Sequence, residues 1–135
     1  MKALRRRRER GGAVFEFALV FPLIGLTALG LVDVSRAMLT YHTLTHASAA
    51  AARFASVRSS TSLTPATTGT ITDRVVDSSV GLEPDKVTVT ATWTPGNIRG
   101  ATVHVETAYP FSPVTPFLPW DTINLVGSAE ARISN

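Results

Sequence analysis

Charged and imidazole side chains recur at helical spacing between residues 33 and 46, and each pair suggests a chemistry. Asp33 and Arg36 are three residues apart and can form a local ion pair, which stabilises a helix by about 0.2–0.5 kcal/mol. His42 and His46 are four apart, a spacing at which two imidazoles on one helical face can bind a metal. No acidic residue lies between the histidines or within a turn after them. We therefore expect an ion pair at the first site, and neither a metal nor a cofactor at the second.

Glu16 is a further candidate, because it places one carboxylate near the start of an otherwise apolar stretch, GGAVFEFALVFP (residues 11–22). The arginine run RRRRER directly precedes that stretch. A carboxylate in hydrocarbon is costly unless another group neutralises it, so an ionisable residue in a membrane segment is a functional-site hypothesis by default. The alternative is that Glu16 reaches from near the helix end to the lipid headgroups and has no specific partner.

Several function classes lack the residues that they need. The chain has no cysteine, which excludes disulfides, thiolate metal sites and a cysteine nucleophile. Neither a strand-turn-helix nucleophile motif nor a glycine-rich phosphate loop accompanies His104 and the scattered serines and aspartates. The net charge of +3 comes from residues 1–11, which hold six bases and one acid, whereas residues 12–135 hold seven bases and nine acids. Bases confined to one end do not make a nucleic-acid-binding face, so we expect neither an enzyme nor a nucleic-acid-binding protein.

A transmembrane helix is predicted over residues 12–32, behind a basic leader at residues 1–11. The run from 13 to 32 has twenty residues and one charge, and at about 1.5 Å per residue it spans a hydrocarbon core of about 30 Å. The basic leader is typical of a cytoplasmic N-terminus. A buried helix of a soluble protein would not need it. A cleaved secretory signal is a stronger alternative, but the apolar run exceeds the usual signal length and no small-residue cleavage site follows at a normal distance.

The helical period continues through residues 33–58 and predicts an amphipathic extension of the same helix. Pro22, in the membrane part, can kink the helix, although transmembrane helices tolerate proline. The apolar stripe of the extension is rich in alanine, so a packing partner can approach it closely. Its members are Val34, Ala37, Met38, Tyr41, Leu44, Ala47, Ala51, Ala52, Phe54 and Ala55.

The rest of the chain is predicted to be a linker, residues 59–69, followed by a small domain, residues 70–135. A short helix is expected over residues 70–81, capped by Thr70 or Thr72 and closed by Gly81. Beyond it the apolar period changes to two in three segments, which predicts three antiparallel strands with one apolar face. The residues of that face are Val87, Val89, Ala91 and Trp93, then Ala101, Val103, Val105 and Tyr109, then Ile123, Leu125, Ala129, Ala131 and Ile133.

A three-stranded sheet with one apolar face needs a cover, and the amphipathic helix is the obvious candidate. The predicted fold is therefore α+β: a long N-terminal helix, transmembrane and then amphipathic, whose outer half packs on a small antiparallel sheet. The aromatic residues near the strand connections are expected to anchor the core and the loops, although Trp120 in the proline-rich loop could equally serve a subunit contact. They are Trp93, Tyr109, Phe111, Phe117 and Trp120.

Residues 10–58 carry an ordered series of short motifs. A basic leader ends at Gly11 and is followed by Gly12-Ala13-Val14-Phe15-Glu16-Phe17, which is similar to the Gly-X-X-X-X-Glu-aromatic processing motif of type IV pilin-like proteins. Pro22 follows shortly after, Asp33 and Arg36 stand just past the membrane, and AARFA ends the small-residue helix. This order resembles the TadE-like family of the tight-adherence (Flp) branch. The β-rich tail shares the resemblance only loosely.

The resemblance implies a pilin-like pseudopilin that a prepilin peptidase cleaves between Gly11 and Gly12, on the cytoplasmic side. Cleavage would make Glu16 the fifth residue and leave Gly12 as a free amine, whereas a cut after Gly12 would make Glu16 the fourth. The implied assembly residues are Glu16, which would meet the N-terminal amine of a neighbouring subunit, and the adjacent Phe17. The implied partners are the inner membrane, the peptidase, other pilin or pseudopilin subunits and the pilus assembly platform.

The predicted location is the inner (cytoplasmic) membrane, crossed once, with the N-terminus in the cytoplasm and the C-terminal domain outside it, or incorporated in a surface pilus. Two alternatives stay open. One is a membrane-anchored binding module whose leader is never removed. The other is a secreted β-rich domain released by signal peptidase. The mass of the mature chain separates the three possibilities.

Overall fold

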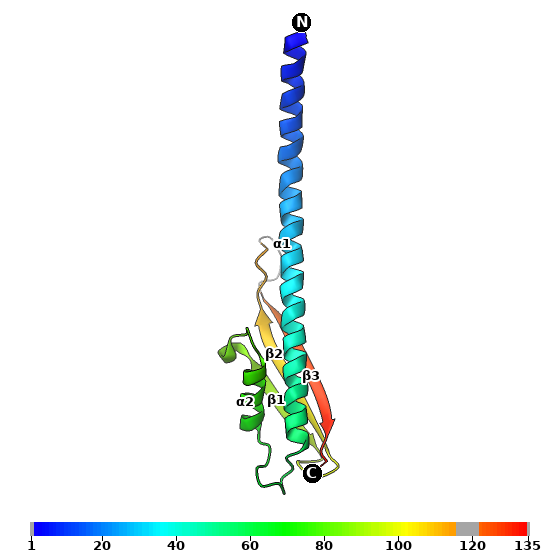
Figure 1. Cartoon of the computed structure of the whole chain (residues 1–135), viewed down its shortest axis with the longest axis vertical. Coiled ribbons are helices and arrows are strands. Elements are labelled where there is room, and N and C mark those ends of the chain that lie inside the picture. The colour runs from blue at the N-terminus through cyan, green and yellow to red at the C-terminus, as the bar shows by residue number, and fades with distance from the viewer. Residues whose placement is uncertain (1, 116–121, 135) are drawn as a thin grey trace.

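A single helix, α1 (Lys2–Ser56), runs through the first two fifths of the chain without interruption. The computed structural model describes residues 2–115 and 122–134, with side chains from residue 12 onward. Phe117 and Trp120, for which we expect anchoring and contact roles, lie outside the described residues. Figure 1 shows the N-terminal half of α1 standing alone, while its C-terminal half lies along the sheet.

The sheet has three antiparallel strands in the order β1 (Thr88–Thr94), β2 (Thr102–Phe111) and β3 (Ile123–Arg132). Alternate residues of each strand face α1, as the period of two predicts: the threonines of β1 are exposed, while Val103 and Val105 of β2 are fully buried. One long helix on one small antiparallel sheet confirms the α+β fold class.

Strand β2 is longer than the alternation of apolar residues suggests. It continues past Tyr109 to Phe111, where the register pairs Pro110 with Asn124 and Phe111 with Ile123. The ladder between β1 and β2 already ends at Thr88 opposite Ala108. Pro110 therefore lies beyond the reach of β1, where a residue without an N–H group is tolerated.

The core between helix and sheet depends on small side chains. Leu44, Ala47, Ala51, Ala52 and Ala55 of α1 are 0 or 1% exposed and pack toward the sheet. Helix and sheet approach closely at Gly127 of β3, where an added Cβ atom would lie 2.6 Å from the backbone of Leu44. The predicted alanine-rich stripe thus brings the helix backbone almost into contact with a strand.

A buried polar cluster fixes the same crossing point. The hydroxyl groups of Ser48 and Thr107 lie 2.9 Å apart, and both face the carbonyl oxygen of Gly127, at 3.1 and 3.2 Å. Ser48 and Thr107 are fully buried. Buried hydroxyl groups are costly unless they are hydrogen-bonded, so this cluster ties the register of β2 and β3 to one position along α1.

The predicted stripe is wrong in the two turns that follow the predicted membrane segment. Val34 and Met38 are each 61% exposed, and Tyr41 is also exposed. Asp33 and Thr40 are buried there instead. The helix turns a polar face toward the protein at this level because the partner that it meets is a loop whose backbone N–H groups need acceptors.

The second helix, α2 (Thr68–Ser78), begins two residues inside the predicted linker and packs Ile71 and Val75 into the core. Thr67 is its N-cap and Thr70 the reciprocal member of a capping box, so the expected cap at Thr70 or Thr72 is wrong. A single 3-10 turn, η1 (Pro84–Lys86), leads into β1. Gly81 takes a left-handed conformation, with φ of 86°, in the turn after α2.

Candidate functional site

Residues 13–32 of α1, called here its apolar half, form an exposed apolar surface. Phe15 is 73% exposed and Leu31 69%, and the side chains between them are almost all open as well. Among the described residues, one helix is long and apolar enough to cross a membrane, and its apolar part lies near the N-terminus. A helix that is apolar on all sides and is not covered by its own protein needs lipid or other helices around it.

The hydroxyl group of Thr27, within this apolar half, is satisfied by the helix itself. The hydroxyl of Thr27 donates to the carbonyl oxygen of Leu23 at 2.8 Å, so it presents little polarity outward. Pro22 lies inside the helix and removes one backbone donor, yet α1 continues through it. Apart from the bond that Pro22 cannot donate, a continuous helix satisfies its backbone groups internally, as a segment in hydrocarbon must.

The predicted processing and assembly residues all lie on this exposed helix. Gly11 and Gly12 are within α1, and nothing lies within 4 Å of a Cβ atom built on Gly12. Glu16 is exposed, and the described side chains give it neither a hydrogen bond nor an ion pair. The ring of Phe17 packs against Phe21, with 5.5 Å between the centroids. Glu16 and Phe17 are thus displayed on the surface, open to a partner.

Asp33 is the most highly connected side chain at the end of the apolar half. One carboxylate oxygen accepts a hydrogen bond from the N–H of Val114 at 2.8 Å, and the other accepts from the N–H of Thr115 at 2.7 Å and from its hydroxyl. Arg36 adds an ion pair at 3.2 Å. The Thr115 hydroxyl, the Val114 N–H and the other donors lower the pKa of the Asp33 carboxyl to about 2, although burial opposes them.

The expected ion pair between Asp33 and Arg36 therefore exists, but it is the smaller part of what Asp33 does. Its main partners are 81 and 82 residues away along the chain, which no local spacing can reveal. One signal was present: Asp33 falls on the buried stripe when Leu44 is followed back through Thr40 and Ala37 in steps of four, three and four. A carboxylate on a buried stripe needs donors.

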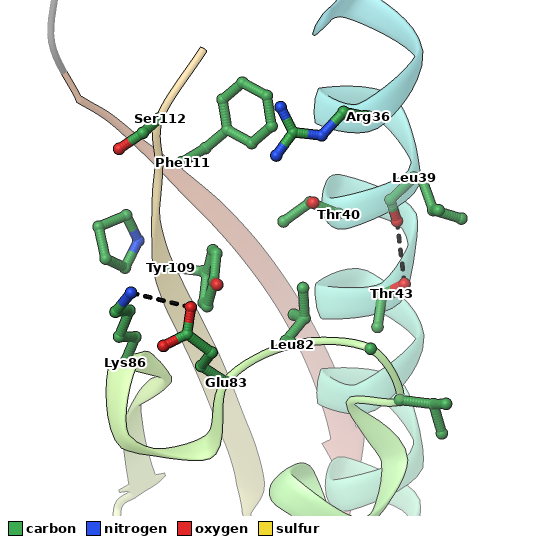
Figure 2. Close-up of a pocket in the computed structure, with 13 residues that line it drawn as sticks. Arg36, Leu39, Thr40, Thr43, Leu82, Glu83, Lys86, Tyr109, Phe111 and Ser112 are labelled. Carbon is green, nitrogen blue, oxygen red and sulfur yellow. Dashed lines mark hydrogen bonds and ion pairs between the residues drawn. The ribbon is translucent and has the colours of Figure 1, made fainter. Parts of the chain in front are cut away.

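Arg36 lies next to Asp33 and lines one end of a cleft. Its guanidinium lies 5.2 Å from the ring centroid of Phe111, and its side chain is 47% exposed. The cleft has a volume of about 310 Å³ between α1, the turn that contains η1 and the end of β2. Figure 2 shows Arg36 at the end of the cleft nearest the apolar half and the pair of Lys86 and Glu83 on the opposite wall.

His42 and His46 are exposed on α1. Within residues 12–115 and 122–134, no three histidine or carboxylate side chains gather in a way that could hold a metal ion. On the outer face of the sheet, His104 pairs with Glu130 at 3.1 Å across β2 and β3. That contact is a surface ion pair when the histidine is protonated, and such pairs contribute little.

Comparison with known proteins gives one match. The model of the family described as TadE-like protein matches residues 11–53. That range begins at the predicted processing site and ends within the alanine-rich part of α1. No curated protein and no solved structure matches the chain. Along α1, from the glycine pair to the buried alanine face, this chain is similar to the TadE-like family, and the match covers about a third of its length.

Proposed function

We propose that this chain is a TadE-like pseudopilin, a membrane-anchored component in the assembly of a tight-adherence (Flp-type) pilus or of related secretion machinery. One observation carries the proposal: the TadE-like match covers a single continuous helix whose first half is apolar and exposed and whose second half is the core of the sheet domain. Such a helix fits membrane anchoring at one end and a rigid connection to a domain outside the membrane at the other. The proposed action is association and includes no catalytic step.

Glu16 is proposed to set the axial register between subunits. It is exposed among apolar neighbours, and a lone carboxylate in lipid is costly. The free amine that cleavage would create on a neighbouring subunit supplies the opposite charge. Pairing the two offsets part of the cost of each charge, and it can occur at only one relative height of the two helices.

Processing requires the helix to open at its N-terminal end. Gly11 and Gly12 lie within α1, whereas a peptidase cleft takes an extended backbone. Glycine is about 1 kcal/mol less favourable than alanine inside a helix. Two consecutive glycines therefore make the proposed scissile bond a point at which α1 unwinds at low cost.

The mass of the chain purified from its native membranes tests this proposal. A chain that starts at Gly12 supports peptidase processing and makes the amine available to Glu16. A start at Met1 contradicts that step and favours an unprocessed membrane-anchored module. A start beyond residue 32 contradicts membrane anchoring altogether, because signal peptidase would then have released the domain.

Replacing Glu16 tests the register mechanism. The Glu16→Ala variant is expected to insert and to be cleaved, but its recovery in a pull-down of assembled subunits should fall at least about tenfold, since breaking a buried ion pair costs about 3–5 kcal/mol. Glu16→Gln, which keeps the size and removes the charge, should show the same loss. Thr27→Ala, in the same apolar half, is the matched control. Normal incorporation of both Glu16 variants would eliminate the register role.

A further inference from the structure

If the apolar half of α1 spans a membrane, a premise that rests on the proposed function, the cleft beside Arg36 lies at the depth of the lipid headgroups. Arg36 is four residues past Val32, the last residue of the apolar run, which at 1.5 Å per residue is about 6 Å. The polar headgroup layer on each side of a bilayer is about 5–7 Å thick. The guanidinium of Arg36 is therefore level with the lipid phosphates.

In this arrangement no uncovered stretch of α1 separates the cleft from the membrane. The hydrogen bonds from Val114 and Thr115 to Asp33 hold the chain beyond β2 against α1 one residue after the apolar run. Figure 1 shows the chain beyond β2 rising along α1 past the tip of the strand. Val114, in that segment, is 63% exposed. The edge of the domain that carries the cleft thus rests at the bilayer surface, with an apolar side chain displayed there.

Arg36 has hydrogen-bonding capacity left for a ligand. A guanidinium has five N–H donors, and within the described residues only one hydrogen bond of Arg36 is found, at 3.2 Å to Asp33. That carboxylate is held mainly by Val114 and Thr115, so it satisfies Arg36 only in part. The guanidinium carbon lies 5.2 Å from the centroid of the Phe111 ring, a cation–π contact that favours this position of the side chain. A planar guanidinium held in this way can bind two phosphate oxygens at once.

The other walls of the cleft are compatible with a headgroup. Lys86 and Glu83 are paired with each other at 2.9 Å on the far wall, so neither brings an uncompensated charge. Thr40 and Tyr109 line the space between that pair and Arg36. A volume of about 310 Å³ is at the lower end of small-molecule sites, enough for a phosphodiester and its polar substituent.

We propose that this cleft binds the phosphodiester headgroup of a phospholipid in the outer leaflet of the membrane that α1 crosses. Arg36 binds the phosphate, Asp33 and Phe111 position the guanidinium, and the cleft between α1 and β2 receives the rest of the headgroup. The acyl chains then lie along the apolar half of the same helix. A bound lipid would fix the height and tilt of the domain relative to the bilayer.

Native mass spectrometry of the full chain released from non-ionic detergent micelles tests this proposal. With phosphatidylglycerol in the micelles, the wild type is expected to retain one lipid, and Arg36→Gln should retain it at least tenfold more weakly. Arg74→Gln, at an exposed position on α2, is the matched control and should bind as the wild type does. Arg36→Lys keeps the cation but not the bidentate geometry, so we expect an intermediate affinity.

The comparison ligands separate the possible sources of binding. Diacylglycerol, which has the same acyl chains without phosphate, should not be retained. Inorganic phosphate should not displace the lipid. Equal retention by wild type and Arg36→Gln, equal retention of diacylglycerol, or displacement by inorganic phosphate would each overturn the proposal. A chain that alkaline carbonate extracts from native membranes fails the proposed function, whereas a membrane-embedded chain without Arg36-dependent lipid binding fails this inference alone.

Discussion

Asp33 links the apolar half of α1 to the chain beyond β2, and the hydrogen bonds that it accepts stabilise the ionised form of its carboxyl. Its folded-state pKa of about 2 lies below the ordinary value of 3.8. The ionised carboxylate therefore stabilises the fold above about pH 4, and this contribution is lost as the pH falls toward 2. Asp33→Asn should lower the melting temperature of the micelle-bound protein at neutral pH, and the difference from wild type should shrink between those two pH values.

Asp73, an exposed carboxylate on α2, is the matched control for this titration. Asp73→Asn should follow the wild-type curve over the whole pH range. The interpretation of Asp33 as an ionised anchor would be contradicted by a stability difference between wild type and Asp33→Asn that stays constant down to about pH 2, the folded-state pKa.

At the level of the elements, apolar periodicity predicted which segments form helices and strands. It mispredicted which residues are buried where the packing partner is distant in the sequence. The threonine and valine alternation identified β1 and β2, and the alanine repeat from Ala47 identified the buried face of α1. The anchor at Asp33 was missed because its partners come from the chain beyond β2, and Val34 was misplaced for the same reason. Local spacing reports which residues share a face, whereas tertiary contacts decide which face is covered.

The crossing of α1 and β3 depends on the missing side chain of Gly127. In Gly127→Ala the new Cβ atom would lie 2.6 Å from the helix backbone at Leu44 and Thr45, so helix and strand must separate. The expected cost is about 1–3 kcal/mol in the free energy of unfolding, measured by thermal or chemical denaturation in micelles.

Gly96→Ala serves as the control for this substitution, because nothing lies within 4 Å of a Cβ atom built there. It should leave stability within about 0.5 kcal/mol of wild type. If Gly127→Ala were equally neutral, the close packing of the strand on α1 would not contribute to stability.

The apolar half of α1 and the sheet domain follow one another along the long axis of the molecule (Figure 1). The end of the sheet domain farthest from the apolar half carries the loop that contains Leu63, whose side chain is fully exposed. Asp33 and its hydrogen-bond donors Val114 and Thr115 lie where the apolar half meets the sheet domain. Because α1 is continuous there, the direction in which the helix is proposed to cross the membrane would decide on which side the entire sheet domain lies.

This direction can be measured because the chain has no cysteine. A single Leu63→Cys substitution should react with a membrane-impermeant maleimide in intact spheroplasts, since positively charged flanks stay in the cytoplasm and place the sheet domain outside. Val14→Cys, exposed on the isolated helix but expected in lipid, should react only after detergent is added. Labelling of Leu63→Cys only after permeabilisation would indicate the opposite orientation. A cytoplasmic peptidase could then not reach the bond between Gly11 and Gly12, and the free amine proposed to pair with Glu16 would not form.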